Sequence, residues 1–384
     1  MRVAQIIDRV HQSGGAERLQ RTFAEAIDPN EVELTVITLR DGLPESEVEL
    51  RDLGVRVVSF PAKTFGDLRR ARALIRFVRQ QRFDLLHAHL PRSTILAGIA
   101  GPASGTPVIA TLHNTERRSG VGPALQAAER WVLRRVARRV IAVGWETARA
   151  QRDVLAGRAI DVIPNAVSEP RVLSATERAE TRRELGVPDG APLLISVARL
   201  VPQKAIQDLL LAFAQLSRSD PAPQLRIAGR GRLEDDLARE IPRLGLGDRV
   251  RLLGLRSDVP RLLASSDLYV SSSHWEGLPV AILEAMAAGL PVVATRVGDA
   301  PRALGVDSGV LVAPRDPGAL ARAIEQLLAD PIRLRELGAA GRARARAKFG
   351  VSAWAERHMA LYAEVVGRRE HSGVSQEEES RCVS

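Results

Sequence analysis

Two glutamates in one short segment are the residues of this 384-residue chain best suited to chemistry. Glu276 and Glu284 stand eight positions apart in the run H-W-E-G-L-P-V-A-I-L-E-A-M-A-A-G-L-P. Pro279 favours the start of a helix, because a first-turn residue needs no amide donor, and Gly289 favours its end. We therefore expect Glu276 in the loop before a helix and Glu284 within the helix.

The start of this expected helix is suited to an anion. The amides of Gly277 and Leu278 and the positive end of the helix dipole would face it, and a diphosphate is the natural occupant. A carboxylate near that end can accept both hydroxyls of a ribose, as in dinucleotide-binding folds. We assign this role to Glu284, which leaves Glu276 to contact a transferred sugar.

The elements that must position these residues follow from short apolar runs that alternate with longer amphipathic segments. Runs from 3–7 to 162–163 predict the strands of a first parallel sheet, and runs from 193–197 to 292–294 predict a second. Open parallel sheets bind ligands beyond the carboxyl ends of their strands. The pattern therefore predicts an α/β protein with two doubly wound domains.

The glutamate segment resembles the signature of the retaining glycosyltransferases of family 4, in which E-G-L-P is followed by E-A-M-A-x-G-x-P. Further matches follow in order over about residues 3 to 345. The resemblance implies the GT-B fold, in which two Rossmann-like domains face a central cleft. It also implies that a sugar is transferred with retention of configuration.

Residues 197–204, V-A-R-L-V-P-Q-K, are similar to the phosphate-binding stretch of the family. By this resemblance, Arg199 and Lys204 neutralise the diphosphate and stabilise the charge that grows as the sugar bond breaks. They join Glu276 as expected catalytic residues. The family usually has glycine after the lysine, whereas this chain has Ala205, so we expect an altered turn there.

The first domain contributes further matches. Gly14 and Gly15 follow the first expected strand and resemble the G-G-A-E loop of the family, where glycine lets the backbone approach a phosphate or sugar. His113, in T-L-H-N-T, resembles the family histidine beside the transferred sugar, and we expect it to contact donor sugar or acceptor as a catalytic residue. For His87 and His89 we expect packing at a strand end rather than a metal pair.

Residues 225–231, L-R-I-A-G-R-G, resemble the loop that lies against the nucleobase. We therefore expect Gly229 and Arg230 to bind the donor, together with Arg256 in a nearby turn. Arg230 stands where the family often has Asp, and D-A-P-R at 299–302 replaces a usual V-G-G-x-x-E pattern. These departures leave the preferred base and sugar open.

The sequence favours a reaction without metal or cofactor. It contains no D-x-D, the carboxylate pair with which other transferases hold a divalent ion, so the helix dipole, Arg199 and Lys204 must replace the ion. The only cysteine, Cys382, excludes an intramolecular disulfide and fits a reducing, cytoplasmic setting. The first residues lack a signal-peptide pattern.

The net charge of +9 indicates anionic partners. Nucleic acid is not favoured, because no recognition motif occurs and aromatic residues make up only 3% of the chain. The arginines near 69–82 and 130–139 predict either a surface that faces an anionic membrane or the acceptor, or a solvated face.

The alternating pattern predicts a first domain over 1–165 and a second over 191–350, and a stretch rich in proline and charge predicts a linker over 166–190. The resemblance implies that the first domain binds the acceptor and the second the nucleotide sugar. We expect 351–369 to form a helix packed back on the first domain and 370–384 to be a disordered tail. The predicted function is transfer of a hexose or N-acetylhexosamine from a UDP- or GDP-sugar to a glycan or lipid-linked acceptor, in synthesis of cell-envelope polysaccharide or glycolipid. The alternatives are a nucleotide-sugar epimerase of the same fold and a non-catalytic nucleotide-sugar-binding protein.

Overall fold

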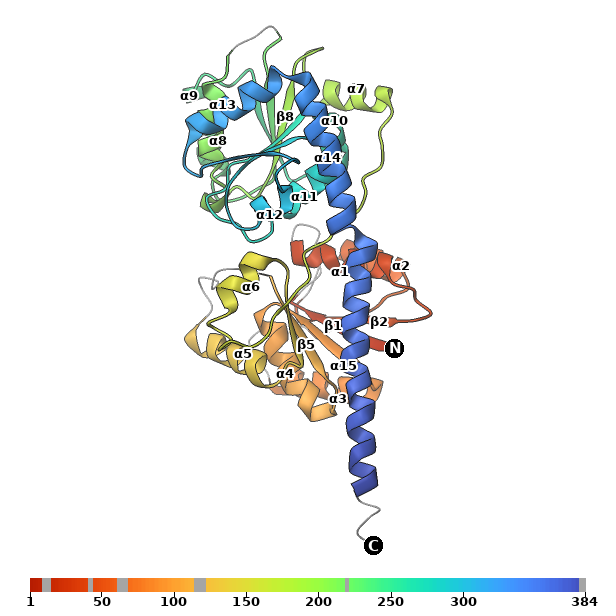
Figure 1. The fold of residues 1–384 in the computed structure, drawn as a ribbon. Coiled ribbons are helices and arrows are strands. Elements are labelled where there is room, and N and C mark those ends of the chain that lie inside the picture. The colour runs from red at the N-terminus through yellow and green to blue at the C-terminus, as the bar shows by residue number, and fades with distance from the viewer. Residues whose placement is uncertain (9–14, 41–43, 61–67, 114–121, 218–220, 380–384) are drawn as a thin grey trace. The chain divides into compact units, whose positions relative to one another are not determined.

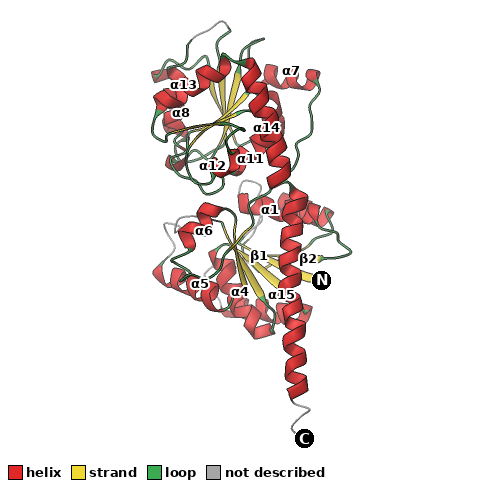
Figure 2. Cartoon of the chain, viewed as in Figure 1, coloured by secondary structure: helices red, strands yellow, loops and turns green. Residues whose placement is uncertain are grey.

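The computed structural model describes residues 1–8, 15–40, 44–60, 68–113, 122–217 and 221–379. The chain divides into two compact units. The first consists of Met1–Asn165 with Val351–Ser384, and the second is Ala166–Gly350. Each unit is built on one β-sheet covered by helices (Figure 1, Figure 2).

The first unit holds a seven-stranded sheet in the order β3-β2-β1-β4-β5-β6-β7, with all pairs parallel. Its strands are β1 (Arg2–Ile7), β2 (Glu33–Thr38), β3 (Arg56–Ser59), β4 (Leu85–His89), β5 (Val108–Leu112), β6 (Arg139–Ala142) and β7 (Asp161–Val162). Since β4 returns to pair with β1, the winding reverses between these two strands. Doubly wound sheets bind ligands at such a point.

Seven helices of the described residues cover this sheet: α1 (Gly15–Ala26), α2 (Pro44–Asp52), α3 (Leu68–Gln81), α4 (Pro91–Ser104), α5 (Pro123–Arg135), α6 (Trp145–Gln151) and α15 (Val351–Glu379). With helices on it, β4 and β5 are buried along their whole length, and their buried residues include the polar His87, His89 and Thr111. Glycine at position 98 allows α4 to approach α5 closely. A Cβ there would lie 2.4 Å from Cγ2 of Val132, so a larger residue would not fit.

The C-terminal helix α15 packs in the first unit through one face. Trp354, His358 and Tyr362, spaced four apart, all place their rings against Phe23 of α1. The helix continues to Glu379, so 370–379, which we expected to be disordered, are helical. A helix that is already nucleated and packed extends at low cost, because each added residue gains a hydrogen bond.

The second unit repeats the topology with six parallel strands in the order β10-β9-β8-β11-β12-β13. They are β8 (Leu193–Val197), β9 (Gln224–Ala228), β10 (Val250–Gly254), β11 (Leu268–Ser271), β12 (Val292–Thr295) and β13 (Val310–Val312). The winding reverses between β8 and β11. The expected class, α/β with two doubly wound parallel sheets, is confirmed.

The helical elements described in the second unit are α7 (Ala175–Glu184), the 3-10 helix η1 (Pro202–Lys204), α8 (Ile206–Ala214), α9 (Glu234–Arg243), α10 (Val259–Ser265), α11 (Val280–Ala287), α12 (Ala300–Leu304), α13 (Pro317–Leu328) and α14 (Pro331–Phe349). Leu209 and Phe213 of α8 and Ile324 of α13 are fully buried in one core with the strands. This core supports the carboxyl ends of β8 and β11.

The stretch 166–190, which we expected to be a linker, lies in the second unit and contains α7. A capping box begins this helix: the amide of Glu177 donates to Oγ of Ser174, and the amide of Ser174 donates to the carboxylate of Glu177. The reciprocal bonds satisfy two amides at the helix start that would otherwise lack partners.

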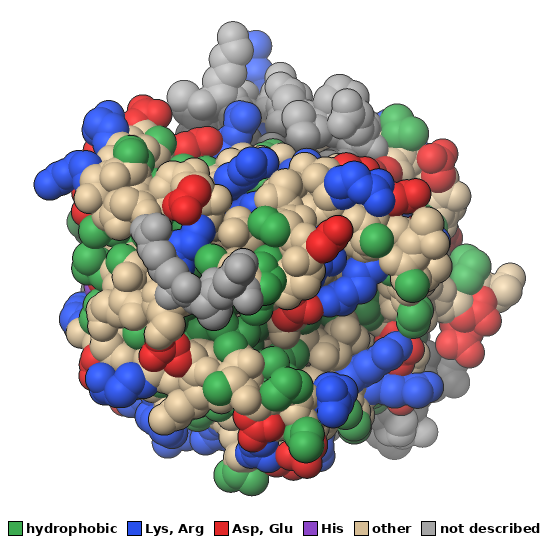
Figure 3. Space-filling view, turned by 90° about the horizontal axis from the view of Figure 1, so that it is seen from above, with side chains coloured by type: hydrophobic (Ala, Val, Ile, Leu, Met, Phe, Trp, Pro, Cys, Tyr) green, Lys and Arg blue, Asp and Glu red, His purple; other side chains and the backbone are tan. Residues whose placement is uncertain are grey.

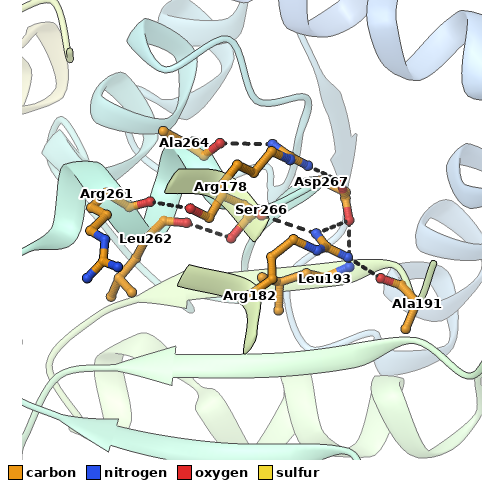
Figure 4. A network of polar contacts seen from close by, with 10 residues as sticks. Arg178, Arg182, Ala191, Leu193, Arg261, Leu262, Ala264, Ser266 and Asp267 are labelled. Atoms are coloured by element: carbon orange, nitrogen blue, oxygen red, sulfur yellow. Dashed lines mark hydrogen bonds and ion pairs between the residues drawn. The ribbon is translucent and has the colours of Figure 1, made fainter. Parts of the chain in front are cut away.

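Polar contacts, rather than an apolar face, hold α7 in place. Figure 4 shows Arg178 and Arg182 reaching the carboxylate of Asp267, with N–O distances of 2.5 and 2.9 Å. Asp267 also accepts from the amide of Leu193 at 2.7 Å, which links α7 to the start of β8. Apolar periodicity cannot detect a helix held in this way, so the sequence indicated a linker.

Charge is mixed on one face of the molecule. Figure 3 shows one face on which Lys and Arg side chains are interspersed with Asp and Glu. The net charge of +9 is therefore not gathered into one basic patch on that face. Such mixing favours solubility more than stability, because exposed ion pairs contribute little to folding.

Acid should destabilise the first unit through His358. Burial lowers the pKa of His358 to about 4 from an ordinary 6.5, so the unfolded chain binds this proton and the folded chain does not. The contribution of neutral His358 to the free energy of unfolding is fully present above pH 6.5, the pKa of histidine in the unfolded chain. It is lost as the pH falls toward the pKa of His358 in the folded protein, and the loss is about 2 kcal/mol at about pH 5. Urea unfolding of the wild type and His358→Leu, at about pH 7.5 and about pH 5, measures this. Equal losses in both proteins would contradict the assignment.

Candidate functional site

Two loops meet at the carboxyl ends of β8 and β11, where the winding of the second sheet reverses. The β8 loop passes through Arg199 into η1, which ends at Lys204. The β11 loop comprises residues 272–279. The amide of His274 donates to the carbonyl of Gln203 at 2.9 Å, so the two loops are joined through their backbones.

Lys204 and Glu276 form an ion pair at this junction. Nζ of Lys204 donates to Oε1 of Glu276, and this oxygen also accepts from Oγ of Ser273 at 2.7 Å. The Glu276 side chain is 8% exposed and the Lys204 side chain 20%. Charges so far from water need a hydrogen-bonded partner. The pair therefore fixes each side chain relative to the other.

Further polar contacts brace the β11 loop. Nε2 of His274 lies 2.8 Å from Oδ2 of Asp208 in α8. Nε2 of Gln203 donates to the carbonyl of Trp275 at 3.0 Å. Both contacts hold residues just before Glu276, so they restrain the loop that carries the carboxylate.

Three glycines let backbone segments at the site pass closer than a side chain allows. A Cβ at Gly229 would lie 1.9 Å from a carbonyl oxygen of the β8 loop, and one at Gly231 2.3 Å from another. A Cβ at Gly298 would lie 2.3 Å from the carbonyl oxygen of Glu276. Our sequence analysis named only Gly229. The V-G pair that follows β12 was the available signal for Gly298.

The two glutamates occupy the expected elements. Glu284 lies on α11 and Glu276 in the loop before it. Burial raises the pKa of Tyr269 above its usual range, and the nearby charges of Glu284 and Glu276 raise it further. The phenol of Tyr269 donates to the carbonyl of Val197 at 3.3 Å. Our sequence analysis missed Tyr269, because nothing separates it from a core aromatic within an apolar strand.

The amides of Gly277 and Leu278 precede α11, which begins after Pro279. Within the described chain, neither amide donates to another protein group. The carbonyl of Gly277, in contrast, accepts from the amide of Asp299 at 3.0 Å, which fixes the peptide orientation. Two free amides at a helix start can bind the oxygens of a phosphate.

The three predicted donor-binding arginines differ in their surroundings. Arg199 and Arg230 are exposed on the loops after β8 and β9, and neither forms an ion pair with any described residue. Arg256 forms a bidentate pair with Asp258, at 2.7 and 2.6 Å. The hydrogen bond to Asp258 raises the pKa of Arg256. The charge of Arg256 is thus already compensated, whereas those of Arg199 and Arg230 are not.

The predicted residues of the first unit stand at the ends of its central strands. His113 follows β5, and its Nε2 lies 3.1 Å from Nδ1 of His89, the last residue of β4. Gly15 is the first residue of α1. Gly14 lies outside the described residues. The structure therefore brings His113 to the carboxyl edge of the first sheet, next to His89.

His87 is enclosed within β4. Its Nδ1 lies 2.6 Å from the hydroxyl of Tyr362, and its Nε2 lies 2.6 Å from Oγ1 of Thr111. Burial lowers the pKa of both His87 and His89 well below the usual range, so these rings are neutral near pH 7. The described residues contain no group of three or more His, Cys, Asp or Glu placed to hold a metal ion.

Known families and proteins match nearly the whole chain. The model of glycosyl transferases group 1 matches residues 177–344, and that of glycosyltransferase family 4 matches 13–171. The 2-deoxystreptamine N-acetyl-D-glucosaminyltransferase of Streptomyces fradiae is 30% identical over 93% of this chain and 91% of its own. The chain belongs to glycosyltransferase family 4. It is therefore a glycosyltransferase, an enzyme that transfers sugars from nucleotide sugars.

Other relatives agree with this assignment. The GDP-mannose-dependent monoacylated alpha-(1-6)-phosphatidylinositol monomannoside mannosyltransferase of Corynebacterium glutamicum is 28% identical over 90% of this chain and 93% of its own. The crystal structure of Anabaena HepE with UDP and glucose has a TM-score of 0.84 and 24% identity, and covers 95% of this chain and 100% of that one. The family 4 glycosyltransferase thus has the GT-B type of fold.

Ala205 stands where the family usually has glycine. Its φ is +47° and its ψ +43°, a left-handed conformation that glycine adopts freely and that costs other residues about 1 kcal/mol or more. Oγ of Ser272 donates to the carbonyls of Lys204 and Ala205 at 3.0 and 2.9 Å and holds the turn. The turn has a conformation suited to glycine, and alanine is strained in it.

Ala205→Gly should stabilise the second unit by about 0.5 to 1 kcal/mol, because relief of strain exceeds the entropy that glycine adds to the unfolded chain. Urea unfolding measures the change. The matched control, Ala238→Gly at an exposed position inside α9, should destabilise the unit by about 1 kcal/mol. Destabilisation by both substitutions would show that Ala205 is not strained.

Proposed function

We propose that this protein is a retaining glycosyltransferase that needs no metal ion. It moves a hexose or N-acetylhexosamine from a UDP- or GDP-sugar to a glycan or lipid-linked acceptor. The observation that carries this proposal is the Lys204–Glu276 pair beside the free amides of Gly277 and Leu278. A cation, a carboxylate and an anion-binding helix start are thereby joined in one place.

The cationic side of this site suits the departing diphosphate. As the bond between the sugar C1 and the phosphate oxygen breaks, the electron pair goes to that oxygen. Lys204, Arg199 and the amides before α11 then stabilise the growing charge, which is the work a divalent ion does in other transferases. The acceptor oxygen forms the new bond to C1, and its proton passes to the departing phosphate.

The contacts of Glu276 favour a role in holding the sugar. Its Oε1 already accepts from Lys204 and Ser273, which reduces the nucleophilicity of the carboxylate. Among the described residues, its Oε2 has only a long contact of 3.4 Å, with Nε2 of Gln203. We therefore assign Oε2 to a hydroxyl of the transferred sugar and attack to the face that the phosphate leaves, which retains the configuration. Glu284 binds the ribose hydroxyls.

The relatives support the donor and acceptor classes. One is named for GDP-mannose, another, from Escherichia coli, for UDP-Gal, and HepE has been crystallised with UDP-glucose. The names of the first two also contain a phosphatidylinositol and a diphosphoundecaprenol acceptor. We therefore place this enzyme in the assembly of cell-envelope polysaccharide or glycolipid, in the cytoplasm.

The surface around α5 supports contact with an anionic membrane surface. A hollow beside its C-terminal end is lined by Arg134, Arg135, Arg138, Arg139 and Arg158. Asp161 and Glu364 compensate only Arg139, at 2.6 and 2.7 Å. Trp131 on the same helix is 57% exposed, so an apolar ring stands beside these charges. No described helix is long and apolar enough to span a bilayer.

Donor binding and turnover test the transferase proposal. With chelator present, one member of a panel of UDP-, GDP- and ADP-sugars should stabilise the protein by roughly 2.7 kcal/mol at about 100 times its Kd. Lys204→Ala and Arg199→Ala should remove most of this shift, whereas Arg239→Ala, an exposed arginine paired with Asp236, should retain it. Glu276→Gln should keep donor binding and lower kcat by about 100-fold.

Each alternative reading has its own outcome in these assays. Dependence on magnesium or manganese would exclude the metal-free mechanism. A donor that binds without hydrolysis or transfer would indicate a binding protein, and an altered donor sugar formed without acceptor would indicate an epimerase. An inverted product anomer would exclude retention.

Membrane contact should depend on the arginines near α5. The double substitution Arg135→Gln with Arg138→Gln should weaken binding to phosphatidylglycerol vesicles, measured by cosedimentation, about 30-fold, at roughly 1 kcal/mol per basic residue. Arg239→Gln in the second unit is the matched control. Unchanged cosedimentation of the double variant would leave this surface as a solvated arginine-rich face.

A further inference from the structure

A small polar chamber lies at the carboxyl edge of the first sheet. Gln5 of β1, Gln20 of α1, His89 of β4 and Asn165 line it, together with His113. The first four side chains are all more than nine-tenths buried. The chamber has room for about one water molecule.

Five buried polar atoms of these side chains make no hydrogen bond to the described protein: Oε1 of Gln5, Oε1 and Nε2 of Gln20, Nε2 of His89 and Oδ1 of Asn165. Each such atom destabilises the folded state by about 1–3 kcal/mol when it lacks a hydrogen-bond partner. Buried polar atoms gathered around one small space are commonly satisfied by a shared internal water. The occupant must both donate and accept hydrogen bonds.

We infer that the chamber binds one ordered water molecule, which fixes the tautomers of His89 and His113. Three of the five atoms are carbonyl oxygens of amides and can only accept, and Nε2 of Gln20 can only donate. A water molecule can donate to two of the carbonyls and accept from Gln20. If Nε2 of His89 also accepted, the water would have one donor fewer for the carbonyls. The excess of acceptors therefore favours a proton on Nε2 of His89.

This proton determines the state of the next ring. Burial lowers the pKa of His89, so its imidazole is neutral and carries one proton. With that proton on Nε2, Nδ1 of His89 accepts, and Nε2 of His113 at 3.1 Å must donate. Nδ1 of His113 then carries the lone pair. This nitrogen then acts as a hydrogen-bond acceptor.

His87 takes no part in this relay. Both of its ring nitrogens are engaged, by Tyr362 and by Thr111, and its ring packs at 4.2 Å from that of His89 without a hydrogen bond between them. The relay therefore runs from the amides of Gln20 and Asn165 through the water and His89 to His113. Gln20, His89 and Asn165 act as positioning residues.

The consequence for catalysis rests on the proposed function. If His113 contacts the donor sugar or the acceptor, its tautomer decides whether it accepts a hydrogen bond from a hydroxyl. A wrong histidine tautomer is costly even when the geometry is kept. The water site and the tautomers themselves do not depend on that role.

Two measurements on the ligand-free, full-length wild type test the inference without any substitution. A high-resolution crystal structure should show a water within hydrogen-bond distance of Nε2 of His89 and of the Gln20 amide. Imidazole 15N spectra should show Nε2 of both His89 and His113 protonated and Nδ1 of both unprotonated. A dry chamber, or a proton on Nδ1 of His113, would overturn the inference.

A variant then links the chamber to turnover. Gln20→Leu should give a mixture of His113 tautomers and lower kcat at least about ten-fold, with KM for the donor little changed. Gln151→Leu, at the end of α6 outside the chamber, is the matched control and should change neither. Gln20→Glu serves if the leucine variant fails to fold. Unchanged tautomers in the folded variant would overturn the relay, whereas shifted tautomers with unchanged kcat would remove His113 from the proposed mechanism and leave the water site intact.

Discussion

The ion pair between Lys204 and Glu276 is the contact on which the geometry of the second unit's site depends. The two residues are far apart in the chain, yet their loops follow β8 and β11, which are neighbours because the sheet reverses its winding there. Neither charge has enough water around it to be stable alone. The ion pair therefore requires both loops to hold one conformation, and Ser273 and Gln203 complete the contacts that keep them there.

The two units share a topology but place different chemistry at the same edge of the sheet. In the second unit this edge carries charged groups and free amides, which suit a diphosphate. In the first unit the corresponding edge carries neutral imidazoles and amides, because burial lowers the pKa of His87 and His89. Neutral donors and acceptors suit sugar hydroxyls. The two edges thus present charged groups in the second unit and neutral polar groups in the first.

Close backbone approach is the second constraint on the site. Gly229 and Gly298 pass where a Cβ would overlap a carbonyl oxygen of a neighbouring loop. Ala205 accepts a left-handed backbone next to Lys204, although it has a Cβ. Loops held this closely can bind a ligand with little reordering, which reduces the entropy lost on binding. The strain at Ala205 is tolerated because two sets of contacts hold the turn. Ser272 donates to the carbonyls of Lys204 and Ala205, and Lys204 pairs with Glu276.

The sequence by itself determined the alternation of strands and helices, the places of Glu276 before a helix and Glu284 within it, and the family. These depend on local apolar patterns and on residue types in fixed order, which a sequence displays directly. It did not reveal α7, whose arginines bind Asp267 rather than an apolar core, nor the helical continuation of α15, which depends on the packing of its first half.

Only the tertiary structure decided which side chains meet. The pairing of Lys204 with Glu276, the nearness of Tyr269 to both glutamates and the contact of His89 with His113 all depend on side-chain directions and on strand neighbours. Residues on different strands have no fixed relation in sequence until the order of the strands in the sheet is known. The sequence therefore identified the chemical groups, and the fold determined which of them act together.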